Sequence, residues 1–125
     1  MSQFGNSGWK GKFRNALRGV WKGAWGQSSF YVHLPVALIV IASLFYLELG
    51  ICRASLLLVC IGNVIGAELF NSAIERLAKS IDEDFNPTVG DALDIASGAV
   101  LVLALISAIV GVVVLYEPIR QVVFG

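Results

Sequence analysis

The chain has 125 residues, of which 57% are hydrophobic, and its nine basic and nine acidic residues give a formal net charge of zero. Only 14% of its residues are charged, against about 25% in an ordinary soluble domain. These values exclude a disordered chain, a nucleic-acid binder driven by net charge and an ordinary soluble domain. The length fits one domain over residues 1–125, and the class that remains is an integral membrane protein with a few spans.

The first predicted element is an amphipathic helix over about residues 9–27. Its apolar residues at helical spacing are Trp9, Phe13, Ala16, Leu17, Val20, Trp21 and Ala24, and the basic residues mostly opposite them are Lys12, Arg14, Arg18 and Lys22. A helix with aromatic residues on one side and basic residues on the other lies in the interface between membrane and water. We therefore expect a surface helix here.

Three apolar segments follow, at about residues 31–49, 54–81 and 89–116. About 20 apolar residues are enough to cross a bilayer as a helix. The first link, residues 50–53, is short, so the first two spans form an antiparallel hairpin. The second link, residues 82–90, is acidic, and Thr88 followed by Asp91 is typical of a capping box that opens the third span. The sequence predicts an all-α membrane protein with a surface helix and three transmembrane helices.

The basic residues predict the orientation of these spans. Five of the nine lie in the N-terminal segment, the first link has only Arg53, and the C-terminal tail has only Arg120. Short cytoplasmic segments carry the excess of Lys and Arg in membrane proteins. We therefore expect the N-terminus and the second link in the cytoplasm, and the first link and the C-terminus outside.

Four polar side chains in the second span share one helical face: Glu68, Asn71, Ser72 and Glu75. Glu68 follows Ala54 by about 21 Å of helix, which leaves it inside a hydrocarbon core that is about 30 Å thick. A carboxylate at that depth is costly and indicates a functional site. The alternative is a polar seam that holds helices together.

This face suits a reaction between a lipid-embedded hydroxyl and a water-soluble phosphate donor. Glu68 can accept the proton of the hydroxyl, and Glu75, two turns nearer the water, can bind Mg²⁺, which is often shared with substrate phosphates. No Walker A loop or soluble-kinase motif occurs in the sequence. His33 lies at the edge of a span, where we expect a structural or interfacial role and not a catalytic one.

Three segments of the chain match one known family. Residues 68–75 are similar to its E-x-x-N-[ST]-A-[IL]-E signature, residues 92–100 to its A-K-D-x-[AG]-[AS]-[AG]-A-V motif, and Phe13-x-x-Ala16-x-x-Gly19 to its surface helix. The chain thus resembles the bacterial integral-membrane diacylglycerol kinase family, which includes undecaprenol kinase. Two further motifs, Phe30-x-x-His33 and Asn86-Pro87, are more similar to the undecaprenol-kinase branch of this family than to its enterobacterial diacylglycerol-kinase branch.

The resemblance implies a homotrimer of three-span subunits in the bacterial cytoplasmic (inner) membrane, with active sites at subunit boundaries. It implies ATP-dependent phosphorylation of a lipid alcohol, diacylglycerol or undecaprenol, at the cytoplasmic face, with Mg²⁺ as cofactor. The partners would be the lipid and further copies of the chain, without nucleic acid. Carried over by position, Glu68 would be the general base and would bind the lipid with Asn71 and Ser97. Glu75 and Gln27 would bind the metal. The nucleotide would be bound by Glu75, Asp84, Phe85, Asn86 and Asp94.

The chain departs from the family pattern at three positions. Gln27 stands where an acidic metal ligand is usual, Leu93 where a lysine precedes the third-span aspartate, and Lys79 where an aspartate is common. Arg76 or Lys79 could supply the missing positive charge near the phosphates. The alternative function is a catalytically degenerate member of the family that acts as a lipid-binding or assembly protein of the membrane.

Overall fold

The structure is a computed structural model that describes residues 8–25, 30–81 and 86–125. In this part of the chain the regular elements are four α-helices, namely α1 (Trp9–Ala24), α2 (Phe30–Tyr46), α3 (Ile51–Ile81) and α4 (Pro87–Phe124). The long helix α3 contacts each of the other three. It is therefore the element on which the remaining helices are assembled, and the prediction of an all-α chain is confirmed.

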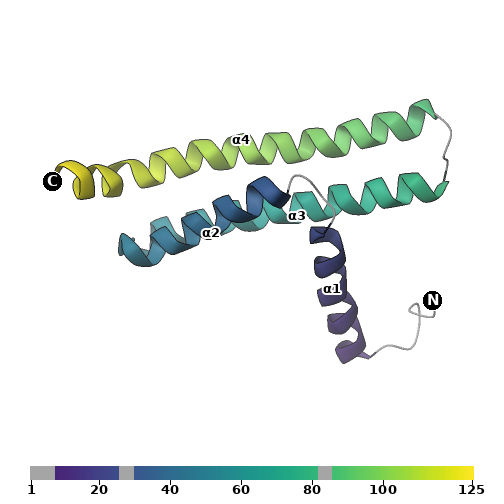
Figure 1. Cartoon of the computed structure of the whole chain (residues 1–125), viewed down its shortest axis with the longest axis horizontal. Helices are drawn as coiled ribbons and strands as arrows, with labels where there is room; N and C mark the ends of the chain where they lie inside the picture. Colours follow the sequence, from purple (N-terminus) through teal and green to yellow (C-terminus); the bar gives the residue numbers. More distant parts are fainter. Residues whose placement is uncertain (1–7, 26–29, 82–85) are drawn as a thin grey trace.

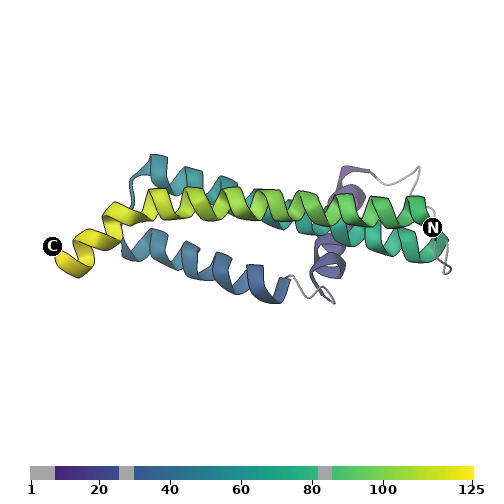
Figure 2. The same cartoon turned by 90° about the horizontal axis from the view of Figure 1, so that it is seen from above.

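The helices α2, α3 and α4 run roughly along the long direction of the molecule, and α1 runs across that direction (Figure 1). Both views show α4 alongside α3 over most of the length of α3, and α2 beside the opposite half of α3 from the α3–α4 link (Figures 1 and 2). The last turn of α1 meets α3 near its middle. This crossing arrangement is the one expected of a helix that lies on a membrane surface next to helices that enter the membrane.

Two of the described helices, α3 and α4, are long and apolar enough to cross a membrane by length and composition. α2 is also apolar, but its 17 residues make it shorter. Most large apolar side chains on α4 are exposed, and the small buried core consists of residues such as Ala37, Leu57, Val64 and Val100. Such an inverted distribution is what a protein needs when its solvent is lipid.

The helix boundaries correct several expectations. α1 ends at Ala24 and not at 27, because Trp25 has an extended backbone. The link between α2 and α3 is residues 47–50 and not 50–53, because α3 begins at Ile51, and the carbonyl of Gly50 accepts a hydrogen bond from the amide of Ala54. In this turn Glu48 has φ 53°, a left-handed conformation that is uncommon for residues other than glycine.

The ends of α4 also differ from the prediction of 89–116. Its N-cap is Asn86, whose side-chain oxygen accepts hydrogen bonds from the amides of Thr88 and Val89, with Pro87 as the first helical residue. The predicted capping box at Thr88 is therefore wrong. At the other end the helix continues through Pro118 to Phe124, and the side chain of Arg120 bonds both carboxylate oxygens of Glu117 there.

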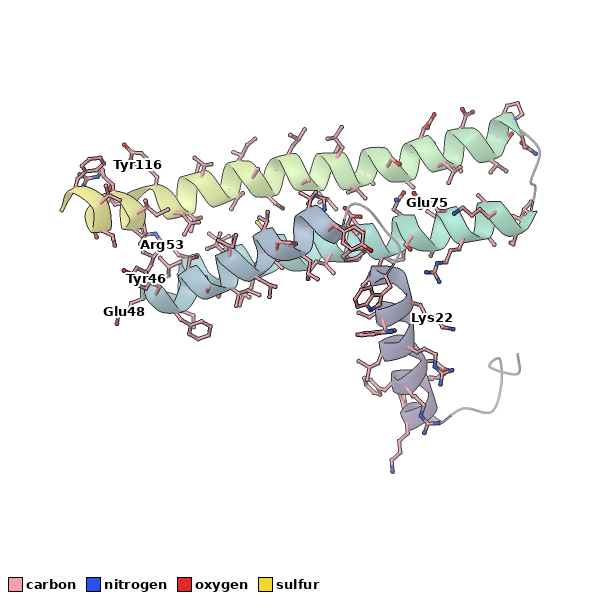
Figure 3. The ribbon with its side chains drawn as sticks, viewed as in Figure 1. Lys22, Tyr46, Glu48, Arg53, Glu75 and Tyr116 are labelled. Atoms are coloured by element: carbon pink, nitrogen blue, oxygen red, sulfur yellow. The ribbon has the colours of Figure 1, made fainter. Side chains whose placement is uncertain are left out.

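Charged and aromatic residues mark the end of the bundle that carries the α2–α3 turn. Tyr46, Glu48 and Arg53 lie at this end together with Tyr116 of α4, whereas Glu75 and Lys22 lie toward the other end (Figure 3). Tyr46 and Tyr116 are both exposed. Tyrosines of this kind gather where a membrane protein passes from hydrocarbon to water. Between these tyrosines and α1, α3 is predominantly apolar.

Candidate active site

The predicted polar face of α3 lies mostly inside the protein. Glu68 is 0% exposed, Asn71 and Ser72 are also buried, and Glu75, one turn beyond Asn71, is half-buried. The spacing of these residues puts them on one side of the helix. Glu68 contacts His33 of α2, and Ser72 contacts Gly23 of α1. A short stretch of α3 therefore contacts two other helices through polar groups.

Glu68 is held by α2. The Nδ1 atom of His33 lies 2.5 Å from Oε1 of Glu68, in a contact that joins residues 35 positions apart. The second carboxylate oxygen, Oε2, is buried and has no hydrogen-bond partner among the described residues. A buried carboxylate with one oxygen engaged and the other available can accept a proton from a group brought to it.

Asn71 lies between Glu68 and Glu75 on α3 and bonds the second of them. Its amide nitrogen donates a hydrogen bond to Oε1 of Glu75 across 3.1 Å, while its own Oδ1 is buried without a partner in the described part of the chain. Glu75 lies toward the end of α3 that leads to the α3–α4 link (Figure 3). The two carboxylates are thus separated along the helix, with an amide between them that can still accept a hydrogen bond.

The last turn of α1 docks on the same stretch of α3. The hydroxyl of Ser72 donates to the carbonyl of Gly23 at 3.4 Å, and the guanidinium of Arg76 donates to the carbonyl of Lys22 at 2.5 Å. Helix C-termini leave carbonyls without intrahelical partners, so these two side chains cap α1. Arg76, which the sequence suggested as a replacement for the missing phosphate-binding lysine, is engaged in this docking.

An apolar groove of about 860 Å³ lies between α2, α3 and α4. One end is lined by His33, Ile65 and Ala104, and the other end approaches Phe124. Its walls are almost entirely hydrocarbon apart from His33, Ser107, Tyr116 and Arg120. The ring that contacts Glu68 therefore also borders a passage that matches the chain of a lipid in chemistry and extent.

The structure does not gather every residue that the sequence predicted for the site. Asp94 and Ser97 are exposed on α4, Leu93 is half-buried, and Asn86 caps α4 with its side chain. Gln27, Asp84 and Phe85 lie outside the described residues. Within the described ranges no three His, Cys, Asp or Glu side chains converge in a metal cluster.

Glu75 fits a metal that enters with a nucleotide. Mg²⁺ is commonly bound by one or two carboxylates while water and substrate phosphates complete its octahedron. Glu75 is a half-buried carboxylate whose Oε1 is oriented by Asn71. Glu75 could therefore supply the protein carboxylate of such a site, and water and substrate phosphates would supply the remaining ligands.

The sequence interpretation did not predict the contact of His33 with Glu68. It treated this residue as structural or interfacial, because nothing in a single sequence relates a histidine in one helix to a glutamate 35 residues later. The available signal was the short link, since a tight antiparallel hairpin brings the start of α2 opposite the second half of α3. The family resemblance of the Phe30-x-x-His33 motif drew attention to this position but gave His33 no role.

Comparison with known proteins places the chain in a family. Residues 14–115 match the model of the family described as prokaryotic diacylglycerol kinase. The chain is similar to the undecaprenol kinase of Bacillus subtilis (strain 168), with 35% identity over 102 residues that cover 82% of this chain and 83% of the relative. The chain therefore belongs to the prokaryotic diacylglycerol kinase family. Its class is that of the membrane lipid kinases, in agreement with its two long apolar helices.

Proposed function

We propose that this protein phosphorylates a membrane lipid alcohol with ATP at the cytoplasmic face of the bacterial inner membrane, and that undecaprenol is preferred over diacylglycerol. The observation that carries the proposal is the fully buried Glu68, whose Oε2 has no partner among the described residues, beside an apolar groove that ends at His33. The undecaprenol kinase relative favours the polyprenol acceptor.

In the proposed reaction the lipid's chain occupies the groove and its hydroxyl reaches Oε2 of Glu68. Glu68 takes the hydroxyl proton while the hydroxyl oxygen forms a bond to the γ-phosphorus of ATP. The bond from that phosphorus to the bridging oxygen breaks, and ADP leaves with the electron pair. Mg²⁺ neutralises phosphate charge when bound, and Glu75 and Gln27 are the residues proposed to hold it.

The remaining nucleotide contacts are proposed from family position. Asp84 and Phe85 fall between α3 and α4 in the sequence, and Asn86 and Asp94 belong to the start of α4. α4 starts at the end of the bundle toward which Glu75 lies (Figures 1 and 3). Ser97 follows one turn further along α4 and would approach the lipid head with Asn71. A nucleotide at this end would meet the lipid hydroxyl from the aqueous side.

The proposed membrane arrangement has three spans and a cytoplasmic N-terminus. α2 supports it because its last residue, Tyr46, lies at the same end of the bundle as Tyr116 (Figure 3). Its 17 residues are within the length that can cross a bilayer. We further propose a homotrimer, since much of the apolar surface of α3 and α4 is exposed and available to a second copy.

The test is a kinase assay on the purified chain in lipid nanodiscs, with radiolabelled ATP and undecaprenol, a shorter polyprenol or diacylglycerol. We expect label in the polyprenol, and we expect Glu68→Gln to lower kcat by about 10²–10⁴-fold, the usual loss for a general base. Glu117→Gln, at a half-buried carboxylate that pairs with Arg120 toward the far end of α4, serves as the matched control. Absence of transfer to every lipid, with nucleotide-independent lipid binding retained, would instead favour the degenerate family member.

A further inference from the structure

We propose that His33 is a positioning residue that orients the carboxylate of Glu68 toward the lipid hydroxyl. Its Nδ1–H donates to Oε1 of Glu68, so that Oε2 is directed to the reacting proton. This inference rests on the proposed function, because it gives a role to the residue that holds the proposed base. It assigns a functional role where the sequence indicated a structural or interfacial one.

The contact fixes one oxygen of the carboxylate and leaves the other. Nδ1 of His33 lies 2.5 Å from Oε1, and Glu68 is 0% exposed, so no water from bulk solvent competes for that oxygen. A carboxylate can only accept hydrogen bonds, which requires the proton of the imidazole to be on Nδ1. Rotation of the carboxylate would break this bond, and Oε2 is thereby held in one direction.

Oε2 is the atom that needs an explanation. Buried polar atoms in folded proteins almost always have a hydrogen-bond partner. Oε2 has none within the described residues, although Oε1 of the same group is engaged. A substrate hydroxyl would complete it by donating its hydrogen, which is also the hydrogen that must leave before the oxygen can attack phosphorus.

The packing of α2 holds the imidazole in place. Phe30 and Ala37 are buried, and they lie three residues before and four residues after His33 on the same side of α2. His33 itself is 26% exposed at its side chain and lines the end of the apolar groove. The imidazole therefore contacts the proposed base, Glu68 of α3, and also lines the groove proposed for the lipid.

The other charged or titratable side chains near the groove do not substitute for His33. Cys60, Tyr116 and Arg120 line it further along α3 and α4, toward the opposite end from Ile65 and Ala104. Among the hydrogen bonds that the described residues make, Glu68 has His33 as its one side-chain partner. Loss of the imidazole would remove the hydrogen bond that fixes the orientation of the Glu68 carboxylate.

The experiment compares His33→Leu, His33→Asn and Tyr31→Phe in nanodiscs. Leucine removes the donor, asparagine keeps an amide N–H close to the former Nδ1, and Tyr31 is exposed on α2 and serves as the control. We expect His33→Leu to lower kcat about tenfold to a hundredfold, the range for loss of a group that orients a reacting one, with the KM for ATP unchanged. His33→Asn should recover most of this loss, and Tyr31→Phe should behave as the parent chain.

A double variant separates this proposal from the proposed function. If His33 acts through Glu68, His33→Leu should lower kcat in the parent chain but add no loss to Glu68→Gln. Normal kcat in His33→Leu, or equal losses with leucine and asparagine, would overturn the positioning role and leave the kinase proposal standing. Normal kcat in Glu68→Gln would overturn the kinase site itself. Thermal midpoints and oligomer size, measured for every variant, identify a loss that is only structural, which would also overturn the positioning role.

Discussion

Arg76 of α3 donates a hydrogen bond from its guanidinium to the carbonyl oxygen of Lys22 in the last turn of α1, 2.5 Å away. This bond lies one residue beyond Glu75, and the bond from Ser72 to Gly23 lies four residues earlier on α3. The two bonds alternate with Glu68, Asn71 and Glu75 along the same helix. Helix α1 is therefore attached to α3 at the candidate site.

The first prediction concerns this attachment. Arg76→Ala should loosen α1, because it removes a charged donor from the negative end of the helix. The site is exposed, so we expect a cost of only about 1 kcal/mol, which should appear as faster amide hydrogen exchange in α1. Lys79→Ala is the matched control, since Lys79 is an exposed cation nearby on α3. If Arg76 instead served the nucleotide, exchange in α1 would stay unchanged while the KM for ATP rose.

The second prediction uses two glycines of α1. A Cβ added at Gly23 would lie 2.6 Å from Cδ2 of Leu69, whereas one added at Gly19 would meet nothing within 4 Å. Gly19→Ala should raise the thermal midpoint, because alanine is favoured over glycine inside a helix by about 1 kcal/mol. Gly23→Ala should lose that gain, since Leu69 must move or α1 must shift.

A compensating change tests the cause of that loss. Leu69→Ala removes the atoms that obstruct a side chain at position 23, so the double variant Gly23→Ala, Leu69→Ala should be more stable than the two single effects predict when added. Strict additivity, measured from thermal midpoints in one detergent, would contradict a direct contact between these residues. Hydrogen exchange in α1 reports whether the helix remains docked.

The sequence was sufficient for the order of the helices and for the face of α3. Apolar segments of near-spanning length predicted the helices, and the 100° spacing of Glu68, Asn71, Ser72 and Glu75 predicted their shared face. The first three of these side chains are buried and Glu75 is half-buried. Such inferences use residues within a few turns of one another. They need no knowledge of how one helix lies against another.

Contacts between helices could not be predicted in this way. The pairing of His33 with Glu68 depends on the register of the α2–α3 hairpin, and Glu48, a residue type that rarely has positive φ, forms part of its turn. The docking of Gly23 against Leu69 depends likewise on how α1 crosses α3. The end of α4 was missed because the predicted span stopped where the uncharged apolar run ends, before Glu117, whereas the helix continues through Pro118 to Phe124.

The third prediction concerns the metal. Glu75→Gln keeps an oxygen that can accept the hydrogen bond from Asn71 and removes the negative charge. We expect the Mg²⁺ concentration at half-maximal activity to rise about tenfold or more, a change of at least about 1.4 kcal/mol. The control is Glu48→Gln, an exposed acid at the opposite end of the bundle (Figure 3). An unchanged Mg²⁺ midpoint in Glu75→Gln would remove Glu75 from the metal site.

The fourth prediction tests whether the groove holds the lipid's chain. Gly111 lines the groove and Gly62 does not, and a Cβ at either would meet nothing within 4 Å. The leucine side chain of Gly111→Leu should fill part of the groove and so reduce the apolar area that the lipid's chain can bury there. Losing about 50 Å² of such contact at about 25 cal/mol per Å² costs about 1.3 kcal/mol, or close to a tenfold rise in the KM for the lipid.

Gly62→Leu should leave the KM for the lipid unchanged, and neither variant should alter the KM for ATP. Small residues on membrane helices also pack against other helices, so oligomer size is measured for both variants by crosslinking in nanodiscs. Equal rises in the lipid KM for the two variants would mean that bulk on the helix surface is responsible, and not the groove. A selective rise with Gly111→Leu at constant oligomer size would assign the chain of the lipid to the space between α2, α3 and α4.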